Sequence, residues 1–179
     1  MNEATREGEG MRNTFDLTVA FAEWIAHAMP PGNSPSAGLE RSLTMSVFTE
    51  KEREYLLSGV RLGRLATVGS DGTPHVVPTA FRYNPDRDTI DIGGHDFAKR
   101  KKYRDVLRNP KVAFVVDDIA SVSPWRVRGI EIRGEAEVLD LGGTELIQGF
   151  APEMFRINPK RIVSWGLEEQ TSFKGRSVP

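Results

Sequence analysis

Between residues 62 and 140 the chain passes repeatedly from short runs of alternating apolar and polar residues to pairs of turn-forming residues. The alternation is clearest where Ile130 and Ile132 stand between Glu131 and Arg133. A period of two is typical of a strand with one buried face, and Asp-Gly or Asn-Pro pairs end such strands. The predicted strand segments are 62–72, 74–88, 89–94, 111–118, 128–140 and 161–167, and the predicted helices are 50–58 and 98–108. Six short antiparallel strands with an inserted helix predict a mainly β fold with a few helices, built as a closed or nearly closed barrel.

The junction between the third strand and its helix carries four consecutive basic residues, Lys99, Arg100, Lys101 and Lys102. Free amides at a helix N-terminus attract anions, and nearby Lys and Arg add directional charge. A charge run is ordinarily a solvated helix face, and four neighbours cannot all aim at one ligand. The formal net charge of the chain is -1, so the cluster is a local excess. We therefore predict a site for a phosphate-bearing ligand.

The composition excludes several classes of function. A balanced net charge argues against a nucleic-acid partner, because coating a polyanion needs an excess of Lys and Arg. The chain has no Cys, which rules out disulfides, thiol catalysis and iron–sulfur clusters. No apolar run reaches the roughly 18 residues of a membrane helix, and no secretion signal is visible. We expect a cytoplasmic protein without membrane contact and without a metal, since no His, Asp or Glu spacing is typical of a metal site.

The N-terminal quarter differs in composition from the rest. Residues 1–44 contain polar and Pro/Gly/Ser-rich stretches around one segment, 15–29, with helical spacing of apolar residues. Thr49 followed by Glu52 is a capping-box pattern at the start of the next helix. We predict that residues 1–44 are an appendage and that residues 45–179 form the compact cofactor-binding domain.

Two stretches, LGRLATVGSDGTPHVVPTAFRYN and RNPKVAFVVDD, resemble the pyridoxamine-phosphate-oxidase-like split β-barrel superfamily. Two more, GGHDFAKRKKYRDVLRNP and PWRVRGIEIRGEAEV, are similar to its branch that uses coenzyme F-420, a deazaflavin. The resemblance extends over about residues 47–166 and includes reductases that finish tetracycline-type polyketides in antibiotic biosynthesis. It implies an FMN-binding-like split barrel, a homodimer with the cofactor at the subunit interface, and hydride delivery to a conjugated C=C of a small substrate.

The resemblance also implies site residues. Basic residues of the strand–helix junction hold the cofactor phosphate, and the ring lies along the second strand. The implied cofactor-binding residues are Lys99, Arg100, Lys102, Val77, Pro78, Thr79, Gly93 and Gly94. Glycine at 93 and 94 is expected to let the backbone approach the ligand closely.

Other residues are candidates for the substrate side. Trp125, Arg126 and Arg128 precede a strand and suit a substrate wall, and either Arg can stabilise an enolate. The completing proton is expected from solvent, a Tyr or a His, without one residue being favoured. His95 is a candidate donor to a ligand, and Trp165 is a candidate cover over the cofactor.

Alternatives remain open at this point. The same fold loaded with FMN can act as an oxidase or flavin reductase, and a barrel without a catalytic side chain can be a non-enzymatic cofactor- or haem-binding protein. Vitamin B6 oxidation is disfavoured, because the relevant family members use a C-terminal Arg and His, whereas residues 165–179 hold no His and only Arg176.

Overall fold

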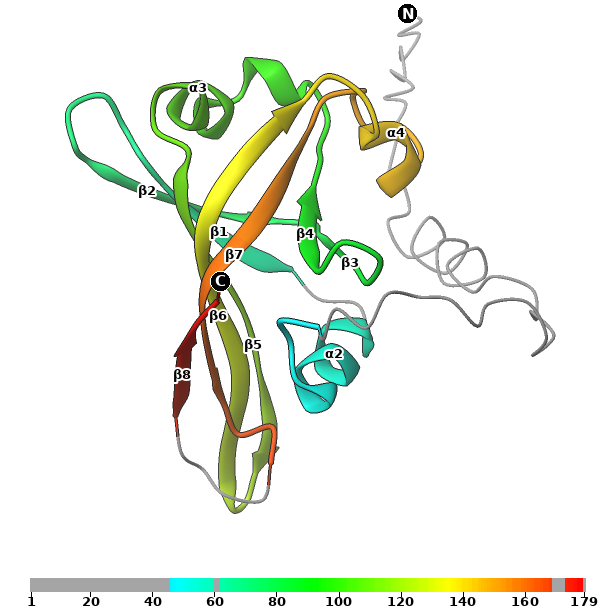
Figure 1. Cartoon of the computed structure of the whole chain (residues 1–179), viewed down its shortest axis with the longest axis vertical. Coiled ribbons are helices and arrows are strands. Elements are labelled where there is room, and N and C mark those ends of the chain that lie inside the picture. Colours follow the sequence, from blue (N-terminus) through cyan, green and yellow to red (C-terminus); the bar gives the residue numbers. More distant parts are fainter. Residues whose placement is uncertain (1–45, 60–61, 169–172, 179) are drawn as a thin grey trace, which may run out of the picture. The chain divides into compact units, whose positions relative to one another are not determined.

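The computed structural model of the protein describes residues 46–59, 62–168 and 173–178 (Figure 1). The predicted appendage lies outside these residues. The strands are β1 (Gly63–Val68), β2 (Pro74–Thr79), β3 (Arg82–Asn84), β4 (Thr89–Ile92), β5 (Lys111–Val122), β6 (Trp125–Leu139), β7 (Met154–Trp165) and β8 (Lys174–Ser177). The helices are α2 (Glu50–Leu57), the 3-10 turn η1 (Phe97–Lys99), α3 (Lys101–Arg108) and α4 (Gly143–Leu146).

All eight strands belong to one antiparallel sheet, in the order β2-β1-β5-β6-β7-β4-β3, with β8 also paired to β7. The two end strands of this order, β2 and β3, are consecutive in sequence. Thr79 and Arg82 are three residues apart, so they lie within about 11 Å of each other. The sheet must therefore curl until its edges approach, as Figure 1 shows. The prediction of a mainly β, nearly closed antiparallel barrel is confirmed.

Several elements differ from the sequence prediction. The predicted second strand, 74–88, is two strands, because the chain leaves β1 after Thr79 and joins β4 from Arg82. The predicted helix 98–108 is interrupted at Arg100, whose backbone is extended (φ -77°, ψ 150°). Strand β8 and helix α4 were not predicted, since neither carries a clear apolar period.

The barrel interior is filled by apolar side chains from the alternating strands. Large side chains that are fully buried are Phe97, Phe114, Phe155, Leu65, Ile90, Ile92, Ile130, Ile132, Ile157 and Ile162. Most of these lie at every second position of a strand, because successive side chains point to opposite faces. The segment 111–118 was predicted as a strand; β5 extends farther, to Val122, and is buried on one face, with Val112, Phe114 and Val116 inside.

Helix α2 is fixed at its N-terminus by the predicted capping box. The Glu52 amide donates to Thr49 Oγ1 at 3.3 Å, and the Thr49 amide donates to Glu52 Oε2 at 2.9 Å. Glu52 is buried and also accepts from Arg176 Nη1 at 2.8 Å, which ties α2 to β8. Burial raises the pKa of Glu52, but the bonds from Arg176 and Thr49 outweigh it and lower the pKa overall. Arg176 is therefore paired with Glu52 in a contact that holds α2 against β8.

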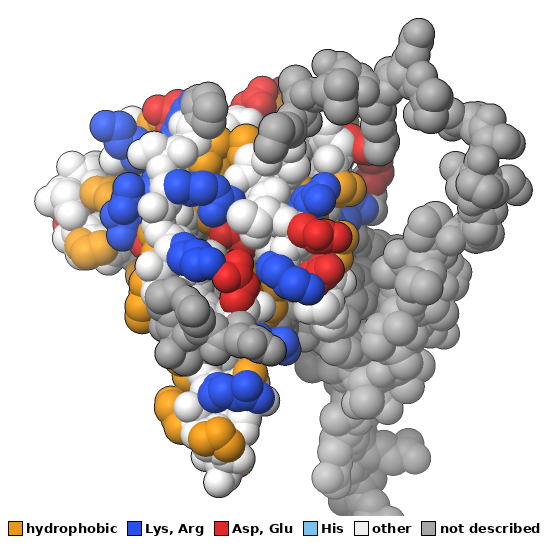
Figure 2. All heavy atoms as spheres, turned by 60° about the horizontal axis from the view of Figure 1, so that its bottom comes forward, with side chains coloured by type: hydrophobic (Ala, Val, Ile, Leu, Met, Phe, Trp, Pro, Cys, Tyr) orange, Lys and Arg blue, Asp and Glu red, His pale blue; other side chains and the backbone are white. Residues whose placement is uncertain are grey.

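The surface mixes charges of both signs. On the face shown in Figure 2, Lys and Arg side chains lie among Asp and Glu side chains, with hydrophobic side chains exposed between them. Within the described part of the chain, no helix is long and apolar enough to cross a membrane.

Candidate functional site

A cleft of about 440 Å³ lies along strand β2, beside the strand–helix junction that follows β4. Its volume falls in the range of small-molecule sites, roughly 300–1,000 Å³. The lining residues are His75, Val77, Pro78, Thr79, Ala80, Gly93, Gly94, His95, Phe97, Arg100, Lys101, Lys102 and Phe150. The cleft thus brings together all of the predicted cofactor-binding residues except Lys99.

Strand β2 forms one wall because of its place in the sheet. It is an end strand that pairs with β1, so the backbone groups on its outer edge have no strand partner in the described chain. His75, Val77 and Thr79 alternate with the more exposed Pro74, Val76 and Pro78. An open strand edge offers N–H and C=O groups to a planar ligand. This wall therefore supplies hydrogen-bonding groups without needing polar side chains.

The four basic residues of the junction have different environments. Lys99 does not line the cleft: its side chain is 81% exposed and pairs with Asp96 at 2.8 Å. Lys101 lines the cleft but donates to both carboxylate oxygens of Asp105, at 3.0 and 2.8 Å. Arg100 lines the cleft and donates through Nε to the His95 carbonyl at 3.1 Å. The four side chains differ in their surroundings because the helix is interrupted at Arg100, whose backbone is extended.

Lys102 is the cation that the structure leaves most available inside the cleft. Its Nζ donates to Thr79 Oγ1 at 3.1 Å and lies 4.9 Å from the centre of the Phe97 ring. No carboxylate in the described residues pairs with it. Burial, with a smaller contribution from Arg100, lowers the pKa of Lys102 to about 8. A half-buried ammonium without a counter-ion is an unfavourable arrangement that a bound anion would relieve.

Gly93 and Gly94 line the cleft, and the structure gives a reason for glycine there in addition to the expected approach of a ligand. A Cβ on Gly93 would stand 2.8 Å from Phe150 and 3.1 Å from Leu146, and a Cβ on Gly94 would stand 3.2 Å from Phe97. Glycine at these positions therefore makes room for protein side chains. At Gly93 the neighbour it admits, Phe150, is itself part of the cleft wall.

Phe150 and His95 lie in contact with each other in the lining of the cleft. Their rings meet edge to face with centroids 5.2 Å apart. The segment after α4 is held there by the Ala151 amide, which donates to the Gly94 carbonyl at 3.0 Å. Sequence analysis missed Phe150, since it lies in a segment without strand or helix periodicity. His95 had been noted as a candidate donor to a ligand.

The predicted substrate residues lie elsewhere in the chain. Trp125 and Arg126 are at the tip of the long β5–β6 hairpin, and Trp125 is 63% exposed. Arg128, farther along β6, is paired with Asp118 at 2.7 Å, which raises the pKa of its guanidinium. Trp165 stacks on Phe173 with ring centroids 5.5 Å apart. Trp125, Arg126 and Arg128 do not line the β2 cleft of their own chain.

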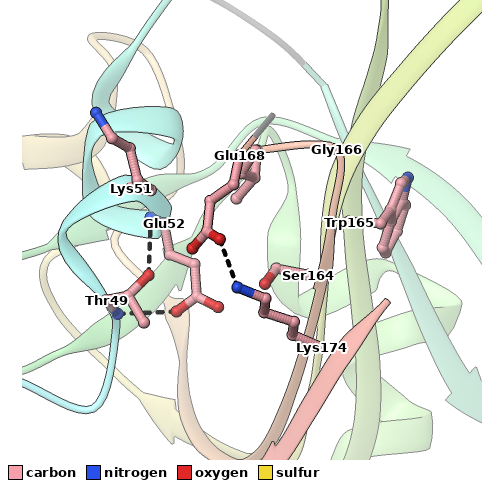
Figure 3. A pocket seen from close by; sticks show the side chains of 9 residues that line it. Thr49, Lys51, Glu52, Ser164, Trp165, Gly166, Glu168 and Lys174 are labelled. Atoms are coloured by element: carbon pink, nitrogen blue, oxygen red, sulfur yellow. Dashed lines mark hydrogen bonds and ion pairs between the residues drawn. The ribbon is translucent and has the colours of Figure 1, made fainter. Parts of the chain in front are cut away.

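A second hollow, between α2 and the end of β7, is too small for a ligand of this kind. Its volume is about 10 Å³, enough for one water. Figure 3 shows that its polar groups are largely paired with one another: Glu168 pairs with Lys174, and Thr49 and Glu52 form the capping box. Nor do the described residues contain a group of three or more His, Asp or Glu side chains able to hold a metal ion. The β2 cleft is therefore the candidate site.

Comparison with known proteins agrees with this architecture. A sequence model of the family described as pyridoxamine 5'-phosphate oxidase matches residues 48–161. The chain belongs to the pyridoxamine 5'-phosphate oxidase family. The matched region contains both walls of the cleft, so the pyridoxamine 5'-phosphate oxidase domain comprises β2, the basic junction and Phe150.

A curated relative of this family member is the 5a,11a-dehydrotetracycline/5a,11a-dehydrooxytetracycline reductase of Streptomyces rimosus subsp. rimosus. The two are 47% identical over 125 residues, which is 70% of this chain and 87% of the reductase.

Solved structures share the fold at low identity. A conserved hypothetical protein of Mycobacterium tuberculosis has a TM-score of 0.54 and 21% identity, covering 72% of this chain and 91% of that one. General Stress Protein 26 of Bacillus anthracis has a TM-score of 0.50 and 20% identity, covering 72% of this chain and 98% of that one. These similarities concern the fold alone.

Proposed function

We propose that this protein is an oxidoreductase that uses reduced coenzyme F-420 to reduce a conjugated C=C of a tetracycline-type polyketide. The reaction class is supported by 47% identity to a reductase named for dehydrotetracycline and dehydrooxytetracycline. The geometric observation that carries the proposal is the cleft. It places the ammonium of Lys102, which has no carboxylate partner among the described residues, beside the open edge of β2, in a volume suited to a cofactor.

The residues present fit a cofactor with an acidic tail. Lys102 and Arg100 would hold its phosphate, because both line the cleft and neither pairs with a carboxylate in the described residues. The outer edge of β2, near Val77 and Thr79, would bind the edge of the ring through backbone groups. Reduced coenzyme F-420 supplies a hydride when bound. The chain contributes orientation, an anion site and apolar cover from Phe97 and Phe150.

The protein is further proposed to work as a homodimer. The tip of the β5–β6 hairpin exposes Ile119, Val122, Trp125 and Val127, which is unusual for a surface that stays in water. Because this hairpin does not line the cleft of its own chain, Trp125 can contribute to a substrate wall only from a second copy.

Binding and turnover measurements test the proposal in sequence. The full-length protein would be titrated with oxidised coenzyme F-420 and, separately, with FMN, following fluorescence. Reduced coenzyme F-420 would then be mixed anaerobically with 5a,11a-dehydrotetracycline, and reappearance of the oxidised cofactor recorded. Tight, salt-sensitive binding of the deazaflavin and its oxidation by the enone support the proposal. Preference for FMN would instead indicate a flavin enzyme, and binding without turnover would indicate a cofactor carrier.

A further inference from the structure

The β2 wall of the cleft also contains a histidine that is backed by a buried carboxylate. His75 lines the cleft with its side chain 27% exposed, and its Nδ1 lies 3.7 Å from Asp105 Oδ2. Thr67 of β1 lies between them: its hydroxyl donates to Asp105 Oδ2 at 2.9 Å and is 3.5 Å from His75 Nδ1. Asp105 and Thr67 are both buried. Three separate elements, β1, β2 and α3, thus converge on one imidazole.

This arrangement selects one tautomer of His75. The hydroxyl of Thr67 has a single hydrogen, which it gives to Asp105, so towards His75 its oxygen can only accept. The ionised carboxylate of Asp105 also only accepts. Both groups therefore favour a hydrogen on His75 Nδ1. Nε2, on the other side of the ring, becomes the nitrogen that gains or loses a proton.

Lys101 keeps Asp105 ionised. It donates to both oxygens of this carboxylate, and that bond, with the one from Thr67, lowers the pKa of Asp105 despite its burial. A fixed negative group behind an imidazole holds the ring in place and in one tautomer.

The other candidate proton donors lack this support. The Tyr83 hydroxyl donates to Asp88 at 2.6 Å, away from the cleft lining. Tyr103 is buried in an aromatic cluster with Phe97 and Phe155. His95 contacts the Phe150 ring, and no carboxylate in the described residues hydrogen-bonds to its imidazole.

We propose that His75 is the catalytic proton donor of the reduction, with Thr67 and Asp105 as positioning residues. The inference rests on the proposed function. When bound, reduced coenzyme F-420 would supply a hydride to the β-carbon of the conjugated ketone and would be left oxidised, while the electron pair of the C=C would move to give an enolate. The imidazolium of His75 gives its Nε2 proton to that enolate, becomes the neutral Nδ1–H imidazole and is reprotonated by solvent.

The first experiment replaces the donor. His75→Ala is expected to lower kcat about 100-fold, within the range of general-acid contributions, while the Kd for coenzyme F-420 changes less than about threefold. Added imidazole should restore part of the rate, and this part should grow with the imidazole concentration. If His75 had only a structural role, no such rescue would be expected. Unchanged kcat in His75→Ala while the wild type turns over overturns this inference and leaves the proposed function standing. A wild type that never oxidises the reduced cofactor overturns both.

The second experiment compares Thr67→Val with Thr67→Ser, and its spectroscopic part needs no substrate. In the cofactor-free wild type, long-range ¹H–¹⁵N spectra of the imidazole should show His75 protonated at Nδ1. The Ser variant keeps a hydroxyl and should keep that tautomer, whereas the isosteric Val variant should shift the population towards Nε2–H. We expect Thr67→Val to lower kcat more than it alters KM. An Nε2–H tautomer in the folded wild type contradicts the assignment.

Discussion

Lys102 Nζ and Thr79 Oγ1 meet at 3.1 Å, which joins helix α3 to the open edge of strand β2 inside the cleft. A hydroxyl is a neutral acceptor and satisfies only one of the three hydrogens of an ammonium. Lys102 lines the cleft, and no carboxylate in the described residues is bonded to its remaining hydrogens. An anionic group placed there would gain charge-assisted hydrogen bonds, so this pair of residues defines the anion end of the site.

Removing the Lys102 ammonium should weaken cofactor binding. Lys102→Ala is expected to lower the affinity for coenzyme F-420 by about 1.5–3 kcal/mol, because a charge-assisted hydrogen bond to phosphate is lost. Lys99→Ala is the matched comparison, since Lys99 is exposed and paired with Asp96. Fluorescence titration of the three proteins at two salt concentrations measures the effect. Equal losses for both variants would contradict the assignment of Lys102.

The cofactor affinity should fall as pH rises through about 8. Burial lowers the pKa of Lys102 to about 8, and only the charged form attracts an anion. Above that pH the free protein loses the charge, so the Kd should rise by roughly tenfold between pH 7 and pH 9. Lys102→Arg keeps a positive charge over this range and should flatten the profile. A profile that is identical in the Arg variant would assign the pH dependence to another group.

Lys102 should lower the stability of the cofactor-free protein. Burial in the folded protein disfavours the charged form of Lys102. The Lys102 amine therefore binds its proton more tightly in the unfolded chain than in the folded one. Lys102→Met is therefore expected to raise the free energy of unfolding near pH 7 by about 1 kcal/mol while cofactor binding is weakened. Chemical denaturation of the cofactor-free proteins measures it. A stability gain that grows above pH 9 would have the wrong sign.

Local sequence patterns predicted much of the fold. The capping box at Thr49 and Glu52 and the alternation along β6 depend on neighbours within a few residues, so both could be read directly. The split of 74–88 into β2 and β3 could not, because it depends on which strands pair across the sheet.

The candidate site was predictable only in part, for the same reason. The basic run marks the junction, yet the extended backbone at Arg100 decides that Lys102 faces the cleft and Lys99 faces solvent. Phe150 arrives from a distant segment, and the Thr67–Asp105 bond joins β1 to α3. Such contacts follow from the packed tertiary structure, to which no short motif corresponds.

The buried ion pair between Arg156 and Asp91 should matter for stability far more than an exposed pair of the same geometry. Arg156 donates to both oxygens of Asp91 at 2.9 and 3.0 Å, and the carboxylate side chain is 2% exposed. Arg156→Ala leaves that charge unpaired and should cost about 3–5 kcal/mol of unfolding free energy. Arg133 forms an equally bidentate pair with Glu131, but the Arg133 side chain is 56% exposed. Arg133→Ala should therefore lower the free energy of unfolding by less than about 1 kcal/mol. Thermal and denaturant unfolding would compare the two, and similar losses would contradict the role of burial.

The exposed tip of the β5–β6 hairpin should be covered by a second copy of the chain. Val122 and Trp125 are 76% and 63% exposed, and a water-exposed apolar tip is stabilised when it is buried in an interface. Trp125→Glu should therefore shift the protein from dimer to monomer in light scattering coupled to size exclusion. Lys111→Gln, which likewise lowers the charge by one at the other end of β5, should leave the dimer intact. A wild type that is monomeric at micromolar concentration contradicts the homodimer. A dimer that survives Trp125→Glu would place its interface on another face of the barrel.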